Sequence, residues 1–391
     1  MTSLIPPLLR ALPPWLSNYA ITEADAGLAE LPAGLQQELM LKLNALSVPQ
    51  PYQRAVRQAT RQALKAWQAN PETTSNCLVI LSQPVEAIAA IVKASLEDYL
   101  LDCDVRFFLR SYRRPPEPLS ILSHLQRELE PEQANEQAAP AAPITETDLQ
   151  EHRPTVMVIP SLEQCFLRCI QGWEGIEYFQ QLGTQDTSRF WVFGCNQWAW
   201  TFLSKVCQVD AYLEQTVSLP ALTDEDLQTG FASLMAFSMS RPDADLTLHI
   251  SPDEAHWSTL ASLSSGTGTI AAQLWLQSLR LEETDLTAEG TLPAEVQQAE
   301  LRATRPSLPS LTSLTVMDRY LLHSLLIHRL MTRAHLALSL GENERTIHSR
   351  VQVLQRAGVI VQQGRWLSVQ PAHYPKLRSE LGNNNFLIGK A

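Results

Sequence analysis

Polar residues follow two apolar stretches near the middle of the chain, where they could contribute to phosphate or water chemistry. The stretch Thr155 to Ile159 is followed by Pro160, Ser161 and Glu163, and the stretch from 190 to 195 is followed by Asn196. A carboxylate in this position could hold a metal ion or polarise water. The commoner role is a surface carboxylate at the start of a helix, where the helix dipole favours it. We therefore expect Glu163 to lie at the surface.

An upstream turn between a predicted strand (76–81) and a predicted helix (85–101) is a second candidate site. The turn carries Ser82, Gln83, Pro84 and Glu86. Phosphate binding at such a turn depends on backbone amides that point at the anion. Pro84 removes one of those amides, and Glu86 places a negative charge where the phosphate would lie. We expect this turn not to bind phosphate.

The elements that position these residues are predicted from apolar periodicity. Between the two apolar stretches, large apolar side chains recur at three- and four-residue spacing, which indicates a helix joining two parallel strands. A further strand is predicted at 105–109. Residues 251–263 and 264–279 are predicted helices, and the polar segment 285–309 is interpreted as a linker.

This arrangement resembles the module of AAA-type and signal-transduction (STAND-like) P-loop ATPases, over roughly residues 55 to 385. The resemblance implies a three-layer, P-loop NTPase-like α/β fold with a parallel sheet and a helical lid. In the family, the turn after the first strand reads Gly-x-x-x-x-Gly-Lys-Ser/Thr, and the Ser82 turn contains neither glycine nor lysine. Pro160 and Ser161 stand where the family has acidic magnesium ligands. Asn196 matches a residue that senses the γ-phosphate, and Arg241 lies where an arginine can act on a neighbouring subunit's nucleotide.

The C-terminal residues form a separate electrostatic region. Residues 315–391 contain ten basic and four acidic residues, a net charge of +6, whereas the remainder has twenty against thirty-seven, or −17. Three predicted helices and a hairpin turning at Gly364 resemble a winged-helix (α+β) domain. Its candidate contacts to DNA or a partner protein are Arg345, His348, Arg350, Arg356 and Arg365.

Composition sets the remaining limits. The chain has 391 residues and a net charge of −11, which argues against generic binding to nucleic acid or anionic membranes. No apolar stretch reaches the roughly 20 residues of a membrane helix, and we expect a cytoplasmic protein. Six scattered cysteines indicate neither a metal site nor a disulfide framework.

We predict four regions: an N-terminal helical region (1–75), a degenerate P-loop NTPase-like domain (76–220) with a disordered insertion near 130–150, a helical lid (221–300) and the winged helix (310–391). Because the glycines, the lysine and the magnesium ligands are absent together, we expect a pseudo-ATPase. It would be a regulatory or scaffolding protein that binds protein partners, within an assembly that contains active ATPases, and needs no cofactor. The alternatives are a DNA-binding regulator that uses the winged helix, and an ATPase with an unconventional site at Glu163, Asn196 and Arg241.

Overall fold

The structure of the chain is a computed structural model that describes residues 27–100, 102–109, 113–137, 153–239, 245–287, 290–293 and 296–389. The chain divides into two compact units, each assembled from distant segments. The parallel-sheet unit comprises Tyr52–Leu219, Tyr320–Ile347 and Asn385–Ala391. The mixed-sheet unit comprises Met1–Pro51, Pro220–Arg319 and His348–Asn384.

Five parallel strands form the centre of the parallel-sheet unit, in the order β3-β4-β5-β2-β6. They are β2 (Cys77–Ser82), β3 (Asp104–Phe107), β4 (Thr155–Ile159), β5 (Phe190–Asn196) and β6 (Gln215–Ser218). Every residue of β2 and β5 is buried, which explains why both read as continuous apolar stretches. The register places Ser82 opposite Asn196, so both strands end at the same edge of the sheet.

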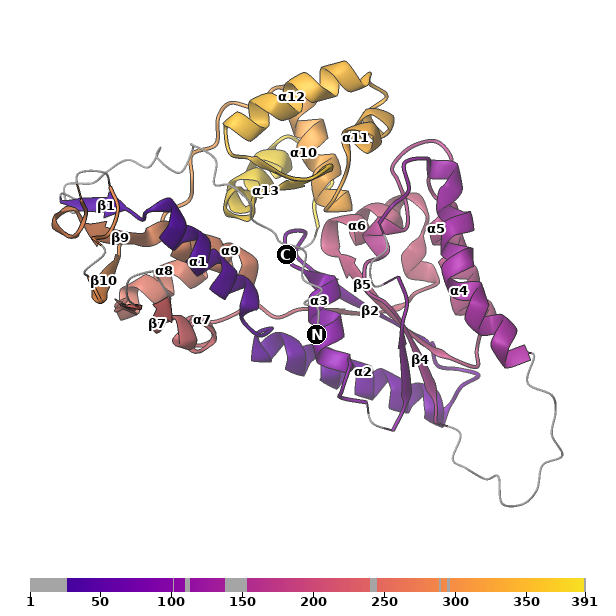
Figure 1. Cartoon of the computed structure of the whole chain (residues 1–391). Coiled ribbons are helices and arrows are strands. Elements are labelled where there is room, and N and C mark those ends of the chain that lie inside the picture. Colours follow the sequence, from indigo (N-terminus) through magenta and orange to yellow (C-terminus); the bar gives the residue numbers. More distant parts are fainter. Residues whose placement is uncertain are drawn as a thin grey trace. The chain divides into compact units, whose positions relative to one another are not determined.

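Helices cover both faces of this sheet (Figure 1). On one face, Trp67 of α2 (Gln50–Ala69) contacts Phe190, with ring centroids 5.8 Å apart, and α3 (Ile88–Leu96) packs on the same strand. On the other face, Phe179 of α5 (Glu174–Gln185) contacts Phe193 at 5.6 Å. Since Phe190 and Phe193 differ by an odd number of positions, they point to opposite faces. The predicted three-layer α/β arrangement is confirmed.

The mixed-sheet unit contains a five-stranded sheet in the order β1-β9-β10-β8-β7, in which only β10 and β8 pair in parallel. Its strands are β1 (Leu28–Glu30), β7 (Ala236–Met239), β8 (Leu246–Ile250), β9 (Leu279–Glu282) and β10 (Gln298–Ala303). Its helices include α1 (Ala33–Ala45), α7 (Asp224–Gly230) and two that match the predicted helices of the lid region, α8 (Glu254–Ser264) and α9 (Gly268–Ser278). Helix α7 begins with a capping box formed by Thr223 and Asp226.

The C-terminal elements follow the order predicted for a winged helix. They are α10 (Val316–His328), α11 (Arg333–Leu340), α12 (Glu344–Arg356), the antiparallel pair β11 (Ile360–Gln363) and β12 (Trp366–Val369), and α13 (Tyr374–Asn383). Thr332 caps α11, and Gly341 ends it in a left-handed conformation (φ 67°).

Three sequence interpretations need correction or extension. The segment interpreted as a linker contains β10, a central strand whose Ala299 and Leu301 are buried. The predicted disordered insertion begins inside helix α4 (Ile121–Gln137), and residues 138–150 lie outside the described residues. The N-terminal region contributes strand β1 as well as helices, because β1 completes the mixed sheet beside β9. The domain boundaries stay a prediction.

Candidate functional site

The candidate site lies at the carboxyl edge of the parallel sheet, where β2, β4 and β5 end. Ligands of open α/β sheets bind at this edge. Ser82 and Asn196 are adjacent there. A Cβ on Gly194 would lie 2.5 Å from the carbonyl oxygen of Pro160, so the turn after β4 packs directly on β5. The structure therefore brings together the residues that the sequence indicated at the ends of three strands.

The turn after β2 is closed by a bond from the Glu86 amide to the Gln83 carbonyl, at 3.0 Å. The Glu86 side chain is 5% exposed, and its Oε1 accepts a hydrogen bond from the hydroxyl of Tyr52 on α2, at 2.9 Å. The turn thus presents a buried carboxylate to the sheet edge. Phosphate at this position would face that negative charge without the amide donors of a glycine-rich loop.

Glu163 is fully buried, so the expectation of a surface carboxylate is wrong. Glu163 lies in the single turn η4 (Leu162–Gln164), all three residues of which are buried, and this turn packs against β5. Its Oε1 accepts a hydrogen bond from the Ser161 hydroxyl at 2.7 Å, and its Oε2 has no partner among the described residues. Burial raises the pKa of the Glu163 carboxyl, although the Ser161 hydrogen bond opposes this shift. The uncharged form is favoured as a result.

Asn196 connects the end of β5 to two other elements. Its Oδ1 accepts a hydrogen bond from the Ala199 amide at 2.8 Å and so caps α6 (Gln197–Val206). Its Nδ2 donates to the carbonyl of Ile327, in the last turn of α10, also at 2.8 Å. Both ends of the side-chain amide are therefore occupied by the protein's own backbone.

The end of α10 and the residues after it lie on this edge of the sheet. The carbonyl of His328 accepts a hydrogen bond from Gln164 Nε2 at 2.7 Å, and its ring contacts Phe166 with centroids 4.6 Å apart. Burial, with the nearby Arg114 guanidinium, holds the pKa of His328 well below its usual range, so the imidazole is neutral. The next residue, Arg329, interacts electrostatically with Glu163 and Glu86.

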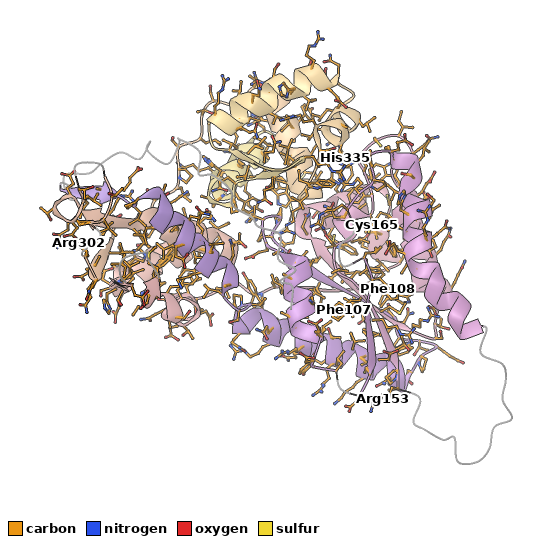
Figure 2. The ribbon with its side chains drawn as sticks, in the orientation of Figure 1. Phe107, Phe108, Arg153, Cys165, Arg302 and His335 are labelled. Atoms are coloured by element: carbon orange, nitrogen blue, oxygen red, sulfur yellow. The ribbon has the colours of Figure 1, made fainter. Side chains whose placement is uncertain are left out.

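Arg114 is a site residue that the sequence analysis missed. It is 1% exposed, and it donates hydrogen bonds to the carbonyls of Phe166, Glu163 and Leu330, the last at 3.3 Å. It thereby ties the η4 segment to the chain that follows α10. Figure 2 labels Cys165 next to η4 and His335 on α11, whose Nε2 donates to the Pro115 carbonyl at 2.9 Å. An arginine whose partners are carbonyls from distant segments has no signature in its sequence spacing.

The other predicted residues are Arg241 and the candidate contacts of the C-terminal elements. Arg241 lies outside the described residues. Arg345, Arg356 and Arg365 are exposed, and His348 is half-buried. The side chain of Arg365 lies over the ring of Trp366, at 5.2 Å.

Arg350, one of the predicted contacts to DNA or a partner protein, forms an ion pair with Asp318 of the same chain. Its Nε donates to Asp318 Oδ1 at 2.9 Å, and its NH2 group contacts Asp318 Oδ2. Burial alone would raise the pKa of the Asp318 carboxyl, but hydrogen bonds from Arg350 and Thr315 lower it overall. Arg350 therefore fastens α12 to the start of α10 through a charged, two-point contact.

No group of His, Cys, Asp and Glu side chains within the described residues could hold a metal ion. No helix among them is long and apolar enough to cross a membrane.

Comparisons with known proteins give structural similarity only. No family model matches the sequence, and no curated protein matches it. Similar solved structures include the ORC1 protein of Aeropyrum pernix in complex with DNA, with 14% identity, 87% of this chain and 94% of that chain covered, and a TM-score of 0.38. Cdc6p of Pyrobaculum aerophilum has 12% identity, coverage of 85% and 94%, and a TM-score of 0.35. The ORC2 protein of Aeropyrum pernix, in its ADPNP and ADP complexes, has 12% identity, coverage of 83% and 92%, and a TM-score of 0.32. At these values the likeness supports no conclusion about activity.

Proposed function

We propose that this protein is a non-catalytic, AAA-like regulatory or scaffolding protein that acts by binding other proteins. The observation that carries the proposal is the contact of α10 with the carboxyl edge of the parallel sheet. Asn196 uses its donor on the Ile327 carbonyl, and Gln164 uses its donor on the His328 carbonyl. Asn196, the candidate γ-phosphate sensor, and the neighbouring Gln164 are thus engaged by the chain itself.

The chemistry of the edge supports the same proposal. Burial raises the pKa of Glu163, the first carboxyl after β4, and a raised pKa weakens a carboxyl as a magnesium ligand because the metal binds its ionised form. The positive charges nearby are Arg329, which interacts with Glu163 and Glu86, and Arg114, which donates to the Glu163 carbonyl. Without glycine amides or a lysine in the Ser82 turn, the edge lacks parts that stabilise a transferring phosphoryl group.

Thermal unfolding with millimolar ATP or ADP, with and without magnesium, tests the proposal. A ligand at 100 times its dissociation constant stabilises a protein by about 2.7 kcal/mol, which shifts the midpoint measurably. We expect no nucleotide-dependent shift and no release of phosphate. A saturable, magnesium-dependent shift would contradict the proposal. Turnover that Glu163→Gln abolishes would establish instead the ATPase with an unconventional site.

A second candidate function, DNA binding through the C-terminal region, is favoured by the exposure of Arg345, Arg356 and Arg365. Neutralising these three residues should then abolish salt-sensitive binding to duplex DNA, because each phosphate contact contributes to the salt slope. Arg350→Gln is not a clean test of DNA contact, since it also breaks the bond to Asp318.

A further inference from the structure

The outer face of α2 carries a line of four basic side chains, which we name the basic stripe: Arg54, Arg57, Arg61 and Lys65. At 100° per residue they fall within an arc of about 80°, and from first to last they span about 16 Å. Helix α2 contains no acidic residue, although the sequence outside 315–391 has a net charge of −17. The stripe is therefore a run of four basic residues in a part of the sequence that is acidic on average.

The stripe is held in place by the opposite face of the helix. Tyr52, Val56, Leu64 and Trp67 are each less than 9% exposed, and Trp67 packs on Phe190 in the centre of the sheet. The side chains of the stripe consequently have a fixed spacing on a rigid element.

Aromatic and carbonyl groups, rather than carboxylates, position two of the four cations. The guanidinium groups of Arg57 and Arg61 lie 5.0 and 4.8 Å from the centre of the Tyr99 ring. Arg57 Nε also donates to the Ser95 carbonyl, at 2.9 Å. These contacts order the guanidinium groups and leave their positive charge uncompensated.

Two lysines on other helices of the chain pair with a carboxylate. Lys42 on α1 pairs with Glu38, and Lys93 on α3 pairs with Glu97, each at 3.6 Å and four residues apart. Within the described residues, none of the four stripe cations forms an ion pair with a carboxylate. Solvated helices generally intersperse both signs of charge, so the stripe differs from an ordinary solvated face.

We propose that the basic stripe of α2 binds an acidic segment of a partner protein. This inference rests on the proposed function, because it gives the chemistry of the partner that a scaffolding protein would hold. The width of the stripe favours a polypeptide over nucleic acid. Asp98 and Asp102 are exposed on either side of Tyr99, the ring that orders Arg57 and Arg61. A duplex about 20 Å wide would bring its phosphates near these two exposed carboxylates, which are close to Tyr99 in the sequence.

The test measures binding of the full-length protein to a fluorescein-labelled helical peptide with a glutamate at every fourth position. About 15 residues make the peptide longer than the stripe at 1.5 Å per residue. We expect salt-sensitive binding that the double variant Arg54→Glu/Lys65→Glu weakens by roughly tenfold or more, since it reverses two of the four charges. Both side chains are exposed and lie outside the Tyr99 contact.

A matched control variant makes the same change in net charge at two basic residues outside the stripe. Arg127 on α4 and Lys205 on α6 are exposed, so Arg127→Glu/Lys205→Glu has the same net charge as the stripe variant. This control should bind the peptide as the unmodified protein does. Equal weakening by both variants, or no binding at low salt, would overturn the proposal.

A competing oligonucleotide separates the two classes of partner. If a DNA duplex binds more tightly than the peptide and the stripe variant abolishes that binding, the partner is nucleic acid and the proposal is wrong. A negative result in these binding experiments would contradict only the proposal for the basic stripe. The proposed function is tested separately, by the nucleotide-dependent shift in unfolding temperature.

Discussion

The carboxyl edge of the parallel sheet and the basic stripe of α2 belong to the same unit and use charged residues in opposite ways. At the edge, Glu163 and Arg114 are at most 1% exposed, and Arg114 contacts backbone carbonyls and the His328 ring of the same chain. On the stripe, Arg54, Arg61 and Lys65 are exposed, and no carboxylate among the described residues pairs with them. The edge lies where ligands of α/β sheets bind, but its charged groups are buried and contact other groups of the protein, as in a protein core. The stripe has the chemistry of a binding surface.

The difference shows that the position of a residue in a fold does not fix its role. An ionisable group buried at the edge destabilises the fold unless it is in its neutral form or its charge is fully hydrogen-bonded. Burial raises the pKa of Glu163 and so shifts it toward its neutral form, and Arg114 donates hydrogen bonds to three carbonyls. Charges on the stripe remain in water, where they contribute little to stability and stay available for binding.

The largest effect is expected at Arg114. Arg114→Met should lower the free energy of unfolding of the parallel-sheet unit by about 3–5 kcal/mol, because buried carbonyls lose a charged donor. Urea unfolding followed by tryptophan fluorescence measures this loss. The control Arg127→Met, at an exposed position on α4, should change it by less than about 0.5 kcal/mol. A loss at Arg114 as small as the control's would mean that the edge is not a core.

A pH-dependent effect of intermediate size is expected at His323, which packs on Trp198 beside the edge. Burial lowers the pKa of His323 from 6.5 to about 4, and its Nε2 contacts the Leu387 carbonyl at 2.8 Å. Because the folded state binds the proton less well than the unfolded state, stability is complete above pH 6.5 and falls as the pH decreases toward 4. The loss amounts to about 3 kcal/mol at most.

His323→Gln keeps a donor for the Leu387 carbonyl and cannot titrate. Unfolding measured between pH 7 and pH 4 should therefore show a flatter profile for His323→Gln than for the unmodified protein. Two profiles of equal slope would show that His323 is accessible to protons in the folded state, and that α10 does not seal this part of the edge.

The smallest effect on stability is expected on the stripe. Arg54→Ala/Lys65→Ala should change the free energy of unfolding by less than about 0.5 kcal/mol, because both side chains are exposed and form no ion pair with a described carboxylate. Thermal unfolding at moderate salt measures this. A larger loss would show that the stripe supports the fold and would remove the contrast with the edge.

Much of the architecture was predictable because the local pattern of apolar residues in the sequence reflects which residues are buried. The apolar stretches that became β2, β4 and β5 consist almost wholly of buried residues, which is why they read as continuous apolar sequence. Strand β10 was missed because its apolar residues alternate with charged ones over only six positions. That short alternation becomes a strand only between its partners β8 and β9.

By itself the sequence determined which phosphate-binding groups are absent and where the strands of the parallel sheet end. Only the tertiary structure decided what lies at that edge. Asn196 and Arg114 each donate to a backbone carbonyl more than 130 residues further along the chain, at Ile327 and Leu330 respectively. Every residue has such a carbonyl, so composition and spacing carry no signal for the contact. The burial of Glu163 likewise follows from the packing of distant segments, because the local sequence is equally compatible with a solvent-exposed carboxylate.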